Sequence, residues 1–262
     1  MRTSIQYLLL NQNQVWIPTW TPAQLGSSLA LWLDADDAST IVLNGNTVSQ
    51  WSDKSGNNRH ATQSTAANQP TRTLSGLNNR TVVTFDGTDD ELRTAASTLG
   101  ITTAASMAFV SSWAINRSQG LLGTEDMTNR FGFFITGSFN NRWNSLTNNF
   151  LPAAEIVQLT PQQPQIVIGT ATNGSQVAFR NGTQQATAAA TFVAPTSSVM
   201  RIGNMLAGTS VPFMQGYHSE IVVTNTVIST NDRQRLEGYF AWKWGLRSNL
   251  PADHPFRNLP PT

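Results

Sequence analysis

The chain has 262 residues, no cysteine and a formal net charge of +1, and only 12% of its residues are charged. The absence of cysteine excludes disulfides and thiolate chemistry. The near-zero charge, without any basic run, argues against a nucleic-acid partner. Thr and Asn are abundant instead, and they favour half-exposed strands and turns respectively. We therefore expect a largely β protein with a neutral polar surface.

Residues 1–23 differ from the rest of the chain and are expected to form an N-terminal arm. A short apolar stretch and an Asn/Gln run precede Trp16 and Trp20, which stand among prolines. Such a segment cannot build a core alone. It lies either along its own domain or on a neighbouring subunit, with Trp16 and Trp20 as anchors. The apolar stretch is too short for a signal peptide, and the sequence has no segment for membrane insertion.

From residue 24 onwards the sequence predicts strands separated by turns. The expected strands, with a long polar connector before the third, are 29–35, 48–53, 80–87, 106–114, 120–123, 130–135, 165–172, 175–180, 183–185, 199–203 and 217–224. A further short strand followed by a loop is expected within 137–151. Asn-Gly pairs at 173–174 and 181–182 indicate two tight hairpin turns in succession. Because strands do not alternate with helices, we predict antiparallel packing of two sheets.

One helix is predicted near the C-terminus, over about residues 230–245. An apolar stripe at helical spacing consists of Leu236, Tyr239, Phe240 and Trp244. Ser229 and Asp232 have the spacing of a capping box, and Gly245 stands where a left-handed residue ends a helix. Lys243 in the last turn suits the helix dipole. The stripe predicts that this helix closes one edge of a β-sandwich.

Two acidic turns are candidates for a metal site. Residues 34–37 lack the glycine and the distal glutamate of a calcium loop, so a turn is the alternative there. Asp86, Asp89 and Asp90 follow the predicted strand 80–87 and could line a calcium site at its end. The alternative is that Asp86 only forms a turn with the glycine after it. No other cofactor is expected.

A candidate carbohydrate site is the Asn-rich segment around Trp143. Sugars are bound by exposed aromatic rings together with neutral hydrogen-bonding groups, and Trp143 stands beside Asn141 and Asn144. An aromatic residue in such a loop also serves packing or an interface, and this alternative stays open.

The sequence lacks the residue patterns of several enzyme classes. The five glutamates are isolated from one another, so the paired carboxylates of glycoside hydrolases are not indicated. Gly-x-Ser-x-Gly and Gly-x-x-x-x-Gly-Lys patterns are absent, and the three histidines lack zinc-ligand spacing. The sequence therefore predicts no catalytic residues and a protein that is not an enzyme.

Several motifs together resemble the concanavalin A-like, or laminin G-like, jelly-roll family. They are LWLDA at 31–35, WSDKSGN at 51–57, VTFDGTDD at 83–90 and RIG at 201–203. The tail RLEGYFAWKWGL at 235–246, followed by LPADHPF at 250–256, resembles a bacterial and bacteriophage branch of that family. The resemblance covers residues 24–262. It implies an all-β, two-sheet jelly roll with a concave face and one C-terminal helix.

The resemblance also carries expectations about function, because this tail belongs mostly to bacteriophage virion proteins and large bacterial surface proteins. The first expectation is a non-enzymatic virion structural protein, a capsid decoration or a tail or fibre component. It would be assembled in the host cytoplasm and act through contacts with other virion proteins and with copies of itself. The alternative is a carbohydrate-binding module or adhesin that recognises host-surface glycans.

Overall fold

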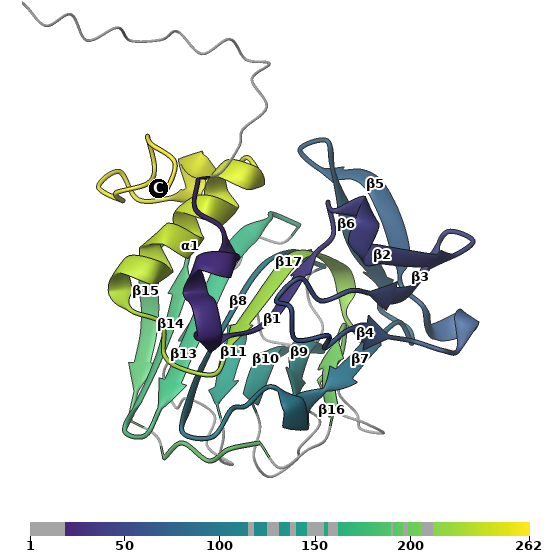
Figure 1. Ribbon diagram of the computed structural model, residues 1–262, viewed down its shortest axis with the longest axis horizontal. Helices are drawn as coiled ribbons and strands as arrows, with labels where there is room; N and C mark the ends of the chain where they lie inside the picture. Colours follow the sequence, from purple (N-terminus) through teal and green to yellow (C-terminus); the bar gives the residue numbers. More distant parts are fainter. Residues whose placement is uncertain are drawn as a thin grey trace, which may run out of the picture.

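The computed structural model describes residues 19–114, 118–124, 131–136, 140–145, 155–156, 162–189, 191–195, 199–205 and 212–262. These residues form seventeen strands and one α-helix, together with short 3-10 turns (Figure 1). The strands are β1 (Leu29–Asp34), β2 (Ile41–Asn44), β3 (Thr47–Trp51), β4 (Ala61–Thr62), β5 (Thr71–Leu77), β6 (Arg80–Asp86), β7 (Leu92–Ala95), β8 (Ala104–Trp113), β9 (Gln119–Thr124), β10 (Phe131–Thr136), β11 (Asn140–Ser145), β12 (Glu155–Ile156), β13 (Gln165–Thr172), β14 (Ser175–Arg180), β15 (Thr183–Ala188), β16 (Val199–Ile202) and β17 (Gln215–Thr224). The helix is α1 (Thr230–Lys243).

The strands pair antiparallel and stack as two layers, so the predicted all-β sandwich is confirmed. In the first layer the order is β15-β14-β13-β8-β17, and the free edge of β17 pairs with β1 along one half and with β6 along the other. In the second layer the order is β12-β11-β10-β9-β16-β7-β4-β3-β2. The hairpin of β5 and β6 connects the two layers through one pairing of β5 with β3.

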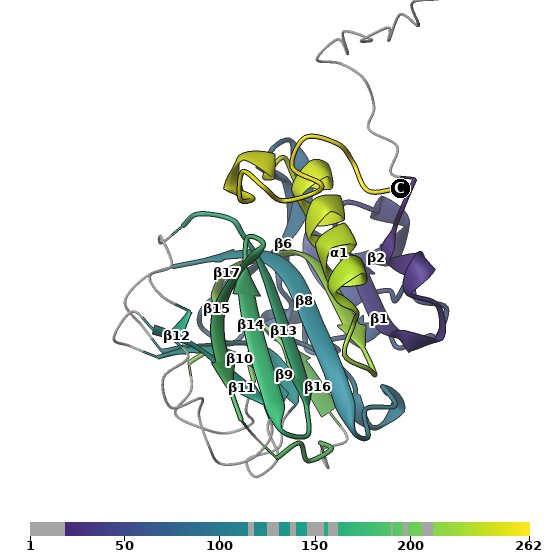
Figure 2. The same cartoon turned by 90° about the vertical axis from the view of Figure 1, so that its left-hand side faces the viewer.

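The central strands of the first layer, β13, β8 and β17, carry apolar residues on both faces. In β17, Ile221 and Val223 belong to the core between the layers, whereas Val222 belongs to a second core on the outer face. Phe109 of β8 meets Phe133 of β10 edge to face across the inner core, with ring centroids 4.8 Å apart. Since successive side chains of a strand point to opposite faces, such unbroken apolar runs require a cover on each side. The second layer covers the inner face, and α1 covers the outer one (Figure 2).

The helix has the boundaries and the buried face that its sequence predicts, but it covers the outer face of the first layer rather than an edge of the sandwich. The Ser229 hydroxyl accepts a hydrogen bond from the Asp232 amide at 3.1 Å, and Gly245 adopts φ +70° just past the last turn. Leu236, Phe240 and Trp244 are fully buried. Among the described residues, no helix is long and apolar enough to cross a membrane.

Five of the described strands are absent from the sequence prediction, namely β2, β4, β5, β7 and β12. β5 lies inside the expected polar connector, and its side chains are mostly exposed or half-buried. Because β5 has no apolar face, it carries no alternation that sequence reasoning could detect. It is held by its pairing with β6 and by a 2.7 Å hydrogen bond between the hydroxyls of Thr73 and Thr84.

The part of the predicted arm that the structure describes packs within its own chain. Trp20 is buried and meets Tyr239 of α1 edge to face, with ring centroids 6.3 Å apart. The Thr19 hydroxyl donates a hydrogen bond of 3.0 Å to the carbonyl of Pro261. The Trp20 ring is therefore part of the outer core and is not available as an anchor on another subunit. Trp16 lies outside the described residues.

Candidate functional site

A pocket of about 440 Å³ opens at one end of the first layer, where β6, β17 and β8 run side by side. It is lined by Thr84, Phe85, Asp86, Ser112, Trp113, Ala114, Gln162, Gln215, Gly216 and Tyr217. The strand register explains why these residues meet, because Tyr217 pairs with Thr84 on one side and with Ser112 on the other. Gln215 in turn pairs with Asp86.

At this end of the sheet, the pairing places most of the polar side chains on one face and the rings of Phe85 and Trp113 on the other. Thr84, Asp86, Gln215 and Tyr217 occupy alternate positions on the face opposite the inner core. Phe85 and Trp113 belong to that inner core and lie behind the pocket. Gly216 lies between them with φ +152°, and a side chain there would collide with the backbone of β8. The pocket therefore has an apolar back and a polar rim.

Tyr217 and Asp86 are the two titratable groups among the residues that line this pocket. Tyr217 is half-buried, and burial raises the pKa of its phenol, which also hydrogen bonds with Ser112. Asp86 is exposed, and its Oδ1 accepts the amide of Thr88 at 2.7 Å. Burial alone would raise the pKa of Asp86, but the amides of the following turn hold it below its ordinary value. Asp86 is thus an ionised acceptor at the rim at neutral pH.

The predicted calcium residues Asp86, Asp89 and Asp90 do come together. Their carboxylates offer one oxygen each within 4.8 Å of one another. Oxygen ligands from carboxylates are what Ca²⁺ prefers, so the donor set fits that ion. The turn alternative is present as well, because Oδ2 of Asp90 accepts the amide of Asp86 at 2.9 Å. The loop is a tight turn that also gathers three carboxylates beside the pocket.

Asp90 is the buried member of this loop. Burial raises its pKa, the charges of Asp86 and Asp89 raise it further, and the resulting value is about 6. The neighbouring Glu91 differs, because it forms ion pairs with Arg201 and Arg93. Within the loop, the negative charges of Asp86 and Asp89 act against ionisation of Asp90.

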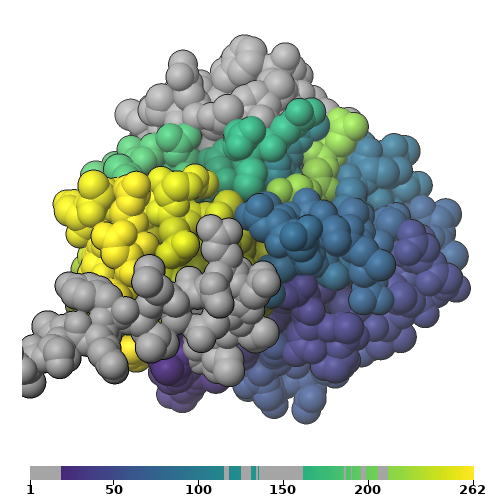
Figure 3. All heavy atoms as spheres, turned by 90° about the horizontal axis from the view of Figure 1, so that it is seen from above, coloured from purple at the N-terminus to yellow at the C-terminus, as the bar shows by residue number. Residues whose placement is uncertain are grey.

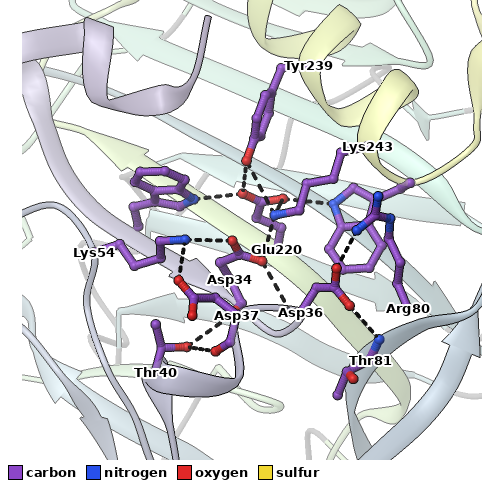
Figure 4. Close-up of polar contacts among 12 residues, drawn as sticks. Asp34, Asp36, Asp37, Thr40, Lys54, Arg80, Thr81, Glu220, Tyr239 and Lys243 are labelled. Carbon is purple, nitrogen blue, oxygen red and sulfur yellow. Dashed lines mark hydrogen bonds and ion pairs between the residues drawn. The ribbon is translucent and has the colours of Figure 1, made fainter. Parts of the chain in front are cut away.

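A second polar cluster lies under the helix, around Glu220 of β17 (Figure 4). Glu220 is fully buried and accepts four hydrogen bonds. The donors are Trp32 Nε1 at 2.7 Å, Tyr239 OH at 2.9 Å, Lys243 Nζ at 2.8 Å and Trp244 Nε1 at 2.8 Å. Lys243 Nζ also lies 2.6 Å from Asp34 Oδ1, so the helix, β1 and β17 meet at one lysine.

The acidic residues of the turn after β1 each have a cationic partner. Lys54 Nζ lies 2.8 Å from Asp34 Oδ2 and 2.7 Å from Asp37 Oδ2. Asp36 forms an ion pair with Arg80, whose strand β6 also donates the Thr81 amide to Asp36 at 3.0 Å. These ion pairs account for the acidic run at 34–37 and favour the turn interpretation over a metal site.

The three histidines are held by local or core contacts. His218 is fully buried between Phe85 and Phe109, and its ring nitrogens meet Ser111 Oγ and the carbonyl of Leu121. Burial lowers the pKa of His218 to about 4, so the imidazole is neutral. His254 bonds Glu237 at 3.1 Å, and His60 accepts the amide of Asp53 at 3.1 Å. Because the Ser111–His218 pair is sealed in the core, it has no access to a substrate.

The structure leaves the predicted carbohydrate segment undecided. The backbone of Trp143 lies in β11 opposite Phe133, and Asn141 and Asn144 belong to the same strand. Their side chains lie outside the described part of the chain, so the role of Trp143 stays a prediction.

Sequence reasoning missed both the pocket and the cluster around Glu220. Tyr217 and Gln215 belong to a predicted strand but carry no motif, and only the strand register brings them to Asp86. Glu220 had a detectable signal, because it is the one carboxylate beside the apolar run Ile221, Val222 and Val223. An ionisable group in such a run requires buried partners. Lys243 was assigned to the helix dipole, whereas its ammonium group is buried against Asp34 and Glu220.

No protein-family model matches this chain, and no curated protein matches it in sequence. Solved structures do match its fold. A sialidase of Trypanosoma rangeli in complex with sialic acid is similar with a TM-score of 0.59 at 14% identity, covering 80% of this chain and 32% of the sialidase chain. The chain therefore spans about a third of the sialidase it matches.

Two other similar structures are binding domains or parts of an enzyme. Domain 4 of AbnA, a GH43 extracellular arabinanase from Geobacillus stearothermophilus, in complex with arabinotriose, has a TM-score of 0.56 at 11% identity, with 77% of this chain and 94% of that domain covered. The binding domain of Paraclostridial Mosquitocidal Protein 1 has a TM-score of 0.60 at 8% identity, with 84% of this chain and 53% of that chain covered.

These similarities correct one expectation and leave others as they were. The prediction that the protein is not an enzyme is contradicted, because its fold is similar to structures of a sialidase and of an arabinanase domain. None of the similar structures named here is a virion protein, so the virion role, its location and the assembly partners remain predictions. What the comparisons show is a β-sandwich of the jelly-roll kind that is also found in glycan-bound and receptor-binding domains.

Proposed function

We propose that this domain binds carbohydrate, in the pocket formed by β6, β8 and β17. The observation that carries the proposal is the combination of a preformed hollow, the half-buried ring of Tyr217 and several hydrogen-bonding side chains on one face. Ligand sites are typically concave, with an apolar back and a few convergent polar groups. A sugar ring has this same division, with apolar C–H faces and hydroxyls around its edge.

The chemistry of the rim indicates the class of sugar. Among the described residues that line the pocket, Asp86 is the only charged one, and the acidic loop 86–90 lies beside it. A carboxylate in the ligand would be repelled there, since like charges in close contact are unfavourable. Thr84, Gln215 and Asp86 offer donors and acceptors to hydroxyl groups. We therefore propose neutral sugars, such as pentose or hexose oligosaccharides, as ligands in preference to acidic ones.

The similar structures support a carbohydrate ligand over the assembly role that the sequence first indicated. Domain 4 of AbnA was solved with arabinotriose, and its whole length is nearly covered by this chain. This likeness concerns the fold, so it supports the proposal without locating the site.

A glycan array tests the proposal with matched variants. We expect the unmodified protein to bind neutral oligosaccharides and Tyr217→Ala to reduce affinity at least about tenfold, which corresponds to roughly 1.4 kcal/mol. Asp86→Asn should also weaken binding, whereas Asp89→Asn should not, because both remove one charge from the same loop and only Asp86 lines the pocket.

Trp143→Ala tests the alternative carbohydrate site, which is the Asn-rich segment around Trp143. If binding survives Tyr217→Ala and disappears in Trp143→Ala, the site lies at β11 and the pocket assignment is wrong. If no glycan binds to any form of the protein, carbohydrate binding itself is refuted.

The predicted virion role is tested by a separate experiment on the N-terminal segment. Deleting residues 1–18, which keeps the buried Trp20 in place, should abolish incorporation into particles if the N-terminal segment is an assembly arm. Unchanged incorporation of the shortened protein would contradict this prediction.

A further inference from the structure

The buried cluster under the helix brings the side chain of a lysine into direct contact with two carboxylates. Lys243 Nζ lies 2.6 Å from Asp34 Oδ1, and Glu220 Oε2 lies 2.8 Å from the same nitrogen. All three side chains are sealed from solvent, with exposed fractions of 8% for Lys243, 4% for Asp34 and 0% for Glu220. Figure 4 shows the three side chains converging from the helix, β1 and β17.

This arrangement meets two physical requirements for amide formation, namely contact between the reacting groups and exclusion of water. In water an amine and a carboxylic acid do not condense, because both are ionised and solvated and because water favours hydrolysis. Here the reacting groups are held in contact, which removes the entropic cost of bringing them together. Trp32, Tyr239 and Trp244 enclose the cluster and exclude water.

We propose that Lys243 and Asp34 condense into an intramolecular amide cross-link, with Glu220 as the group that transfers protons. The Lys243 ammonium first gives a proton to Glu220, and the neutral Nζ then attacks Cγ of Asp34. Glu220 returns that proton to the departing oxygen of Asp34, which takes a second proton from Nζ and leaves as water. The balance is one ammonium and one carboxylate consumed, with one amide and one water formed.

Glu220 is suited to this transfer by its surroundings. Burial raises its pKa, and the neighbouring charge of Asp34 adds to that effect, against the opposing charge of Lys243. A raised pKa makes Glu220 a stronger proton acceptor than an ordinary carboxylate, and Lys243 Nζ lies in hydrogen-bond contact with it. The hydrogen bonds from Trp32 and Trp244 hold each Glu220 oxygen in place, so Oε2 stays directed at the lysine.

The cross-link is assigned to Lys243, although Lys54 also contacts Asp34. Lys54 Nζ lies 2.8 Å from Asp34 Oδ2 but is shared with Asp37, and its side chain is 23% exposed. No contact links Lys54 to Glu220 in the described structure, so Lys54 has no comparable proton acceptor. After condensation with Lys243, Lys54 would retain Asp37 as its counterion.

The product would join the first strand of the sandwich to the last turn of α1. It would close a loop that contains nearly the whole β-sandwich, and such closure restricts the unfolded chain. The sheet could then not separate from its covering helix even when both lose their packing.

Intact mass spectrometry under denaturing conditions tests the proposal on the full chain. We expect the unmodified protein to be lighter than its sequence by the mass of one water, in stoichiometric yield. Lys243→Arg keeps the charge but cannot form this amide, and it should have the full sequence mass. Glu220→Gln should also have the full mass or gain the cross-link at least about tenfold more slowly. Lys54→Arg is the matched control and should still lose one water.

Tryptic mapping identifies the bond. We expect no cleavage after residue 243, and a branched peptide that joins Lys243 to Asp34. Full sequence mass in the unmodified protein after prolonged incubation would overturn the proposal. A lost water would also overturn it if mapping places it elsewhere, for example in a cyclised Asp86-Gly87 pair, or if Lys54→Arg abolishes it.

Discussion

The cluster around Glu220 and the acidic loop at 86–90 are both rich in carboxylates, yet their charges are balanced in different ways. Glu220 has four donors on its two oxygens and a lysine beside it. Asp90 has one backbone donor and two neighbouring carboxylates, and its pKa rises to about 6. The first set of charges is satisfied inside the protein, whereas the second leaves negative charge beside a pocket. A balanced cluster stabilises the fold, and an unbalanced one is the feature expected of a binding surface.

If the cluster around Glu220 stabilises the fold, removing Glu220 should lower the stability of the protein strongly. We expect Glu220→Ala to lower the free energy of unfolding by about 3–5 kcal/mol, because buried donors of the cluster, among them Trp32, Tyr239 and Trp244, would lose their acceptor. Urea denaturation at pH 7 measures the effect. Asp232→Ala, an exposed position of the same helix, is the control and should lose about 1 kcal/mol. Equal losses in the two variants would show that the cluster is not a stabilising unit.

Trp244 tests whether the helix depends on packing over this cluster. Trp244→Ala should lower the free energy of unfolding by roughly 3–5 kcal/mol, as for other buried aromatic residues, since its ring is fully buried. Trp242 on the same turn is only half-buried and is the matched control, with an expected loss near 1 kcal/mol. A loss below about 1 kcal/mol for Trp244→Ala would place that face of the helix in solvent.

His218 should make the folded protein less stable at acidic pH. Its pKa is about 4 in the folded protein against an ordinary value of 6.5, so only the unfolded chain takes up a proton between these values. The stabilising contribution is complete above pH 6.5 and falls by about 3 kcal/mol as the pH drops to 4. Urea denaturation of the protein and of His218→Gln at pH 7 and pH 4.5 isolates this term. A parallel pH dependence in both would exclude His218 as its source.

Asp90 should make the folded protein less stable as the pH rises, which is the opposite of the effect of His218. Its folded pKa of about 6 exceeds its ordinary value of 3.8, so its ionisation destabilises the folded protein as the pH rises from 4 to 6. Asp90→Asn should therefore raise the free energy of unfolding by about 1 kcal/mol at pH 7 and leave it unchanged at pH 4. Thermal unfolding at the two pH values measures this, and a loss of stability at pH 7 would indicate a structural role instead.

Calcium binding to the acidic loop at 86–90 is the prediction with the smallest expected effect on stability. A bound Ca²⁺ would neutralise Asp86, Asp89 and Asp90, so millimolar Ca²⁺ should raise Tm at pH 7 by a few degrees. Asp90→Asn should lose this response, whereas Glu237→Gln, a buried change in the helix, should retain it. The absence of any Ca²⁺-dependent shift in the unmodified protein would leave the loop as a turn only.

The sequence by itself determined the fold class, the terminal helix and the turns, because these follow from local patterns. The apolar run within 217–224, the Asn-Gly pairs and the cap at Ser229 act over short distances, and each appears in the structure as expected. The acidic residues of 86–90 were also found, since a turn brings neighbours in sequence together in space.

Only the tertiary structure decided which distant residues share a site. Tyr217 meets Asp86 through the register between β17 and β6, and Lys243 meets Asp34 through the docking of α1 on the first layer. Both contacts join segments that are more than a hundred residues apart in the chain. Such contacts depend on how sheets and helix pack, and side-chain patterns within a segment carry no record of that. For this reason the sequence showed a sandwich with a helical cover, and the structure showed its pocket and its buried lysine.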